Sequence, residues 1–195
     1  MEIPKVKFIY AYPFDNGRRN LYSERNLGYY PSIEEIKEKM SQWKKLWDET
    51  NENDKIVLKL VELTKRTPER SLECFVFGGG INPMSTPFLM PIMSKDKLRS
   101  DEKFIDTMIH EILHIFVSGA SKYFDMIRSK YSKEVVLTHN HIIIYAFLEK
   151  IYLDMFNSKP LDFDVIDLPV GYSRAIEIVK EQGYETLIGE YYSLL

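Results

Sequence analysis

Two histidines and a glutamate near the middle of the chain have the spacing of a metal site on a helix. His110 and His114 are four residues apart, which places them one turn apart on the same helical face. Two neutral imidazoles in this arrangement can bind one zinc ion. Glu111 is turned by about 100° from His110, so it is better placed to take a proton from a water on the metal than to be a ligand. The spacing therefore predicts two zinc ligands and one general base.

The residues on either side of this motif predict a helix that is buried on one face. Ser100 can cap a helix that begins with Asp101 and Glu102, because acidic residues favour the positive end of a helix. Apolar residues recur at helical spacing and predict a buried stripe: Ile105, Met108, Ile109, Ile112 and Phe116. Asp106 lies one turn before His110 and could accept a hydrogen bond from a ligand, but we expect a plain surface acid.

The segment from 107 to 116 resembles the zinc helix of the zincin metallopeptidases. That family has Thr or Val three places before the first His, and here this residue is Thr107. It also has an apolar residue two places after the second His, and here this residue is Phe116. The match covers only about ten residues. The resemblance implies a metallopeptidase with one zinc ion per chain, a water activated by Glu111, and a peptide or protein as substrate.

A catalytic zinc ion generally has three protein ligands, so one ligand remains to be found. The metzincin branch of the family has a third His six residues after the second; here this residue is Ala120, which excludes that branch. The gluzincin branch takes its third ligand, usually Glu, from a later helix. The helix expected at 134–156 offers His141, Glu149 and His139. His141 falls among apolar residues on the helical wheel and His139 among polar ones, so we predict His141, with Glu149 as the alternative and His139 after it.

The pattern of the whole chain predicts the α+β class, with a mixed N-terminal sheet and a helical C-terminal half. Strands are expected at residues 6–12, 56–63 (a run that could also be helical) and 72–77, with a proline-containing edge strand at 84–93. Helices are expected at residues 32–50, from 101 through the motif to 116, and at 121–131, 134–156, 172–182 and 185–192. A long loop is expected at 13–30 and an extended segment at 162–169. We expect one zincin-like catalytic domain over residues 1–195. Its upper sub-domain, 1–118, holds the sheet and the zinc helix, and its lower sub-domain, 119–195, is helical.

Composition limits the classes of partner. The net charge is −3, and there is no basic stripe that would bind a phosphate backbone. The longest apolar run, 142–148, is too short to span a bilayer. We therefore expect a cytoplasmic protein that binds neither nucleic acid nor membrane, and the sequence leaves the oligomeric state open.

Three further interpretations stay open. The resemblance implies that residues 80–89 form the roof of a substrate cleft. A tyrosine is expected to stabilise the oxyanion, with Tyr145, Tyr152 and Tyr172 as candidates. The alternative functions are a zinc-dependent hydrolase of another substrate such as RNA, and a non-catalytic interaction domain stabilised by a metal.

Overall fold

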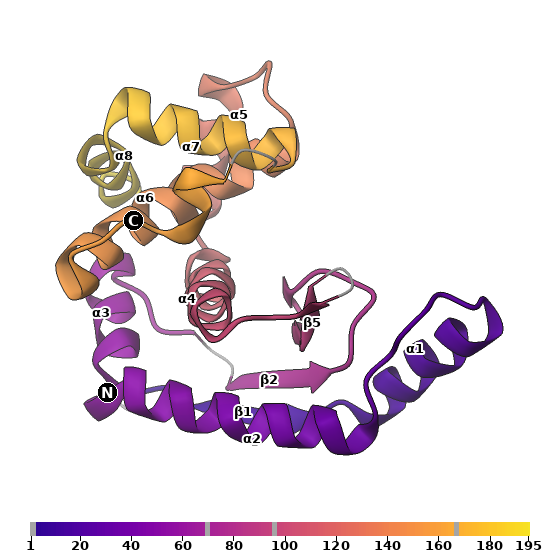
Figure 1. The fold of residues 1–195 in the computed structure, drawn as a ribbon. Helices are drawn as coiled ribbons and strands as arrows, with labels where there is room; N and C mark the ends of the chain where they lie inside the picture. The colour runs from indigo at the N-terminus through magenta and orange to yellow at the C-terminus, as the bar shows by residue number, and fades with distance from the viewer. Residues whose placement is uncertain (1–2, 69–70, 95–96, 166–167) are drawn as a thin grey trace. The chain divides into compact units, whose positions relative to one another are not determined.

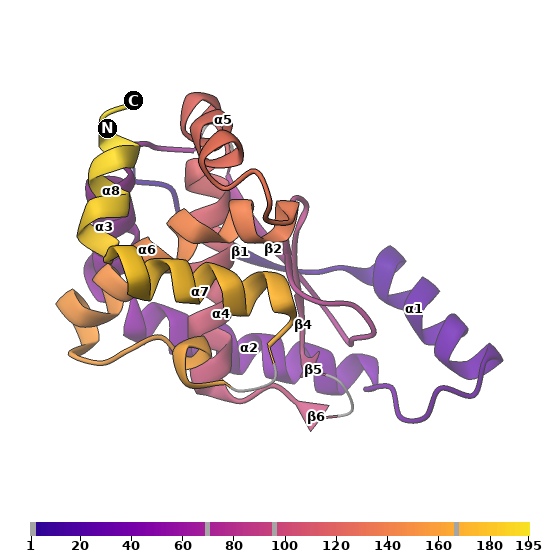
Figure 2. The same ribbon diagram turned by 90° about the horizontal axis from the view of Figure 1, so that it is seen from above.

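The computed structural model describes residues 3–68, 71–94, 97–165 and 168–195 (Figures 1 and 2). Within these ranges the chain forms eight α-helices and a small mixed sheet, so the predicted α+β class is confirmed. The chain divides into two compact units, one ending at Ile115 and the other starting at Phe116. This division falls inside a helix, whereas the sequence predicts a sub-domain boundary after residue 118.

The sheet belongs to the first unit and has the strand order β1-β2-β4-β3. Its strands are β1 (Val6–Tyr10), β2 (Leu72–Phe77), β3 (Met84–Ser85) and β4 (Phe88–Pro91). β2 pairs in parallel with both β1 and β4, with Phe8 opposite Cys74 and Val76 opposite Met90. Cys74, the single cysteine of the chain, is fully buried, and burial raises the pKa of its thiol. A separate hairpin of β5 (Met93–Ser94) and β6 (Lys97–Leu98) follows.

The edge strand predicted at 84–93 is correct only in part. The segment splits into β3, which lies at the edge, and β4, which lies inside the sheet between β2 and β3. Both prolines avoid the middle of a ladder, because Pro87 lies between the two strands and Pro91 is the last residue of β4. Prolines therefore mark the ends of these strands rather than an exposed position for the whole segment.

Four helices begin in the first unit: α1 (Tyr12–Glu24), α2 (Ile33–Thr50), α3 (Lys55–Thr64) and α4 (Asp101–Val117). The predicted capping box of α2 is confirmed, since Ser32 and Glu35 each accept a hydrogen bond from the other's backbone N–H. Figure 1 shows α2 running beside β1 and β2. Its Trp43 stacks on Phe104 of α4 with ring centroids 4.3 Å apart, so α2 supports the start of the helix that carries the motif.

Two predictions for this unit are wrong. The loop expected at 13–30 is largely α1, which projects from the end of β1 in Figures 1 and 2. The strand expected at 56–63 is also wrong and its helical alternative is correct, because this segment is α3. Its buried residues follow helical spacing, and the side chain of Asn51, which precedes the helix, accepts from the N–H groups of Ile56 and Val57 at 2.8 and 3.3 Å. In the first segment the turn motif is outweighed by tertiary contacts, whereas the continuous apolar run at 56–63 suits a buried helix as well as a strand.

The carboxylate of Asp15 explains why its segment does not form the expected turn. It is fully buried and accepts hydrogen bonds from the hydroxyls of Tyr10 and Tyr30 at 2.8 and 2.7 Å. It also accepts from the backbone N–H of Gly78 at 2.8 Å and from Arg19 at 3.1 Å. A buried carboxylate needs such partners, and α1 holds the side chain where all four can reach it.

The glycine run that follows β2 is required by the same packing. A Cβ atom on Gly78 would lie 2.5 Å from the ring of Tyr30. Gly80 has φ +88°, which other residues rarely adopt, and Arg18 packs against it and donates to its carbonyl oxygen at 2.6 Å. The run therefore allows α1 and the segment after it to approach the sheet closely.

Replacement of Tyr30 by Phe tests the role of Asp15. Loss of a hydrogen bond to a buried carboxylate should lower the free energy of unfolding by about 2 kcal/mol at neutral pH. Burial, and then the hydrogen bond to Asp15, raises the pKa of Tyr30. Above about pH 10 the unfolded wild-type chain therefore releases a proton that the folded chain retains, and stability falls with pH. Urea titrations above pH 10 should show a shallower fall for Tyr30→Phe, while Tyr12→Phe, an exposed control in α1, should match the wild type.

The second unit is helical, with α5 (Ser121–Lys130), α6 (Val136–Phe156), α7 (Val170–Gln182) and α8 (Tyr184–Tyr192). These helices confirm the four expected between residues 121 and 192, with ends shifted by a few residues. Leu161–Asp164 forms a short 3₁₀ turn, so the extended segment expected there is wrong at its start, and residues 166–167 lie outside the described residues. α6 is buried on nearly all sides, and α7 and α8 pack against it. Among the described residues, no helix has the length and apolar character needed to cross a membrane.

Candidate metal centre

Helix α4 presents the motif as the sequence predicts. Ser100 caps it by accepting from the N–H of Lys103 at 3.2 Å, and the predicted apolar stripe is buried. His110 is buried and His114 half-buried. Their Nε2 atoms lie 3.2 Å apart and their ring centroids 5.0 Å apart. Both rings therefore turn the same nitrogen toward one point, as two ligands of one ion must.

Glu111 is also buried, with 8% of its surface exposed. Burial raises the pKa of its carboxyl group to about 7, and the positive charge of Arg99 acts in the opposite direction. A carboxylate with a pKa near neutral can both accept and return a proton under ordinary conditions. This is the property that the predicted role of a general base requires.

Arg99 is a residue that sequence reasoning missed. Its guanidinium is buried, and Nη1 donates to the hydroxyl of Thr107 at 3.2 Å, one turn before Glu111 on the same face of α4. Nothing in the local pattern distinguishes it from other basic residues near a helix start, so the sequence carries no signal for its burial. Asp106 also differs from prediction, because it is 2% exposed and pairs with Lys103 at 3.2 Å. It is not a plain surface acid.

In the second unit, His141 is buried on α6 with 5% of its surface exposed. Its Nδ1 lies 2.7 Å from the backbone oxygen of Leu137. A carbonyl oxygen can only accept, so Nδ1 carries the proton and Nε2 presents a lone pair. Burial lowers the pKa of His141 to about 4, although the Leu137 carbonyl and the charge of Asp162 oppose the shift. The ring is therefore neutral at physiological pH, the form that binds a metal.

The three histidines come together in the structure. One ligand atom from each of His110, His114 and His141 lies within 4.8 Å of the others, close enough to bind one metal ion. The set consists of neutral imidazole nitrogens, which suit zinc and several other transition metals. Its composition fits the predicted zinc site, and the identity of the metal stays a prediction.

The two other candidates for the third ligand have different environments. His139 is 6% exposed and donates from Nε2 to the backbone oxygen of Tyr131 at 2.8 Å. The helical wheel groups His139 with polar residues and so predicts a solvated side chain. This prediction is wrong, because a helical wheel does not include Tyr131, which follows α5 and contacts His139. Glu149 is half-buried, and burial raises its pKa while Lys159 and Lys180 act in the opposite direction. Neither residue belongs to the histidine group found among the described residues.

The structure also separates the three candidate tyrosines. The ring of Tyr172 packs edge-on against His141 with centroids 4.3 Å apart, and the ring of Tyr145 lies 6.0 Å away. The Tyr145 hydroxyl donates to Asp162 at 3.0 Å. Tyr152 is eleven residues after His141, about 16 Å along the helix axis, and packs on Phe156. Tyr145 and Tyr172 therefore remain candidates for an oxyanion donor, and Tyr152 is the weakest of the three.

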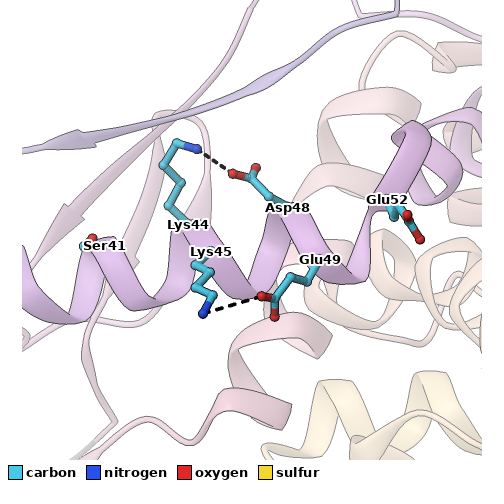
Figure 3. Close-up of a pocket in the computed structure, with 6 residues that line it drawn as sticks. All are labelled: Ser41, Lys44, Lys45, Asp48, Glu49 and Glu52. Atoms are coloured by element: carbon cyan, nitrogen blue, oxygen red, sulfur yellow. Dashed lines mark hydrogen bonds and ion pairs between the residues drawn. The ribbon is translucent and has the colours of Figure 1, made fainter.

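A hollow lies on the surface of α2 and of the turn that follows it. Figure 3 shows the residues that line it: Ser41, Lys44, Lys45, Asp48, Glu49 and Glu52. Lys44 pairs with Asp48 at 2.5 Å and Lys45 with Glu49 at 3.8 Å. These are exposed pairs one helical turn apart, typical of a solvated helix face. We therefore interpret this surface as a solvated helix face rather than as a second site.

Comparison with protein-family models, with curated proteins and with solved structures found no match for this chain. The resemblance to zincins therefore depends on the ten-residue motif, about as many residues as one helix of three turns. The arrangement of the three histidines and Glu111 is the independent observation on which a functional proposal can be based.

Proposed function

We propose that this protein is a zinc-dependent metallopeptidase whose zinc ion is held by His110, His114 and His141. The observation that supports the proposal is the convergence of three histidines next to a buried glutamate. A structural zinc site is normally closed by four protein ligands, whereas a catalytic site has three and keeps one position open. Three histidines with a carboxylate beside them correspond to the second kind.

The residues of the chain would divide the reaction between them. The three histidines would hold the ion, which would supply Lewis-acid chemistry by lowering the pKa of a water toward neutral and polarising a substrate carbonyl. Glu111 accepts the proton of the attacking water and returns it to the leaving amine. Tyr172, or Tyr145 if its single hydroxyl proton leaves Asp162, is proposed to donate a hydrogen bond to the carbonyl oxygen as negative charge develops there.

We propose that a peptide substrate binds along β3. It forms one edge of the sheet in the described part of the chain, and an extended peptide can add to such an edge by backbone hydrogen bonds. Residues 80–89, which the resemblance implies for the roof of the cleft, include this strand. Met84 of β3 is exposed. Because β3 has only two residues, we expect a peptide substrate to pair weakly with it and to need further contacts with side chains of the protein.

Two alternative functions are disfavoured by particular observations. A zinc-dependent hydrolase of RNA would need a basic surface, and the net charge of −3 argues against one. A salt-sensitive nucleic-acid binding curve would favour this alternative. A non-catalytic domain stabilised by metal has no need for a buried acid such as Glu111 next to its ligands, because burying a carboxylate costs free energy.

The proposed site predicts close to one zinc ion per purified chain. Elemental analysis of the wild type should find about one equivalent, while His110→Ala and His114→Ala should lose most of it, because two ligands hold zinc far more weakly than three. His139→Ala, which removes an imidazole outside the group, is the matched control. Equal zinc content in all four proteins would contradict the site.

A further inference from the structure

We propose that Tyr172, at the first turn of α7, is a positioning residue for His141; this inference depends on the proposed metal site. An imidazole on a helix can rotate about two side-chain bonds, so a ligand must be held at more than one point. The Leu137 carbonyl holds Nδ1 at 2.7 Å and so fixes the proton on that nitrogen. The ring of Tyr172, edge-on at 4.3 Å and inclined by 63°, supports the imidazole itself.

The position of Tyr172 depends on Gly171. A Cβ atom on Gly171 would lie 2.8 Å from Cβ of Leu137 and 2.9 Å from the end of the same side chain. Only a glycine lets α7 approach α6 this closely at the residue whose carbonyl holds His141. The backbone N–H of Tyr172 donates to Pro169 at 2.8 Å, which fixes the start of the helix. α7 therefore brings an aromatic ring to the imidazole through a contact that any larger residue would disturb.

Tyr145 provides a second aromatic ring near the imidazole. It lies one helical turn after His141, with its ring 6.0 Å from the imidazole and 6.4 Å from the ring of Tyr172. Its hydroxyl is held by Asp162 at 3.0 Å. The imidazole is thus flanked by two tyrosine rings and a carbonyl, all from the second unit. Groups that orient a metal ligand typically change metal affinity by about 10–100-fold when they are removed.

The test is the zinc affinity of full-length variants, measured by competition with a chromophoric chelator, which needs no enzymatic activity. Tyr172→Ala should weaken zinc binding by about 10–100-fold, and Gly171→Ala should weaken it in the same direction. Tyr172→Phe keeps the ring and should bind within about twofold of the wild type. Tyr184→Ala removes another tyrosine ring from the same unit and should also bind like the wild type. The visible absorption of the cobalt(II)-loaded proteins should change for Tyr172→Ala and not for Tyr184→Ala.

Each outcome decides a different point. If the wild type binds no zinc, the proposed metal site is wrong and this inference fails with it. If the wild type binds zinc and Tyr172→Ala binds it equally well, only the positioning role fails. If Tyr172→Phe is as weak as Tyr172→Ala, the hydroxyl rather than the ring is responsible, and the inference as stated is overturned. Thermal unfolding of the metal-free proteins separates loss of affinity from loss of the fold.

Discussion

Replacement of Glu111 by Gln is expected to slow peptide hydrolysis by orders of magnitude while the protein keeps its zinc. Gln is nearly isosteric with Glu and leaves all three histidines in place, so the metal site should remain intact. It cannot accept a proton, so the reaction loses its general base. The loss in kcat should be about 10²–10⁴-fold, with little change in KM. The measurement is the hydrolysis rate on a mixed peptide library, together with zinc content.

The matched control for this variant is Glu102→Gln, an exposed acid on the same helix, which should retain both activity and zinc. A Glu111→Gln variant that cleaves peptides at the wild-type rate would refute the role of Glu111. If the wild type cleaves none of the library, the peptidase proposal fails while the metal site can still be judged from zinc content. The two parts of the proposal are thus tested separately.

Replacement of His141 by Ala should remove zinc nearly as completely as His114→Ala. Both variants leave two imidazoles, and His141 presents its Nε2 lone pair because Leu137 holds the other nitrogen. His139→Ala should keep zinc, since the Nε2 of His139 donates to the Tyr131 carbonyl. Glu149→Ala should keep most of the metal, with at most a loss of about 10–100-fold in affinity if it orients a ligand indirectly. Zinc content by elemental analysis and affinity by chelator competition are the measurements.

His139 is buried, so His139→Ala should be checked for stability before its zinc content is interpreted. His139→Gln, which keeps a donor for the Tyr131 carbonyl, is the milder control. If Glu149→Ala empties the site while His141→Ala does not, the third ligand is glutamate. The assignment of His141 would then be wrong, and the site would follow the usual gluzincin pattern instead.

The sequence predicted the motif helix well because its signals agree with one another. The cap at Ser100, the apolar stripe and the spacing of His110 and His114 all favour the same helix, and the packing of the folded chain agrees with these local signals. The inward face of His141 could be predicted for the same reason, from its apolar neighbours on α6. The motif helix and the buried side of His141 each depend on residues within one helix, so the local sequence is enough to predict them.

The parts that could not be predicted depend on contacts between segments distant in sequence. Asp15 reads locally as a turn residue, and only Tyr30 and Gly78 explain its place in a helix. A helical wheel of α6 predicts a solvated His139 because it includes only residues of α6. Tyr131, at the end of the preceding helix, accepts a hydrogen bond from His139. Arg99 precedes α4 and belongs to no periodic pattern of buried residues, so the sequence does not predict its burial. Its guanidinium donates to the hydroxyl of Thr107 in α4.

The complete burial of Cys74 gives this protein an internal reporter of its own folding. A thiol reacts with alkylating reagents only as an exposed thiolate, and here burial both blocks access and raises the pKa. With no second thiol in the chain, every labelled molecule must have opened around β2. Where reclosing is faster than alkylation, the labelling rate therefore reports the fraction of molecules that are open around β2, and it can be followed by mass in each variant without adding a probe.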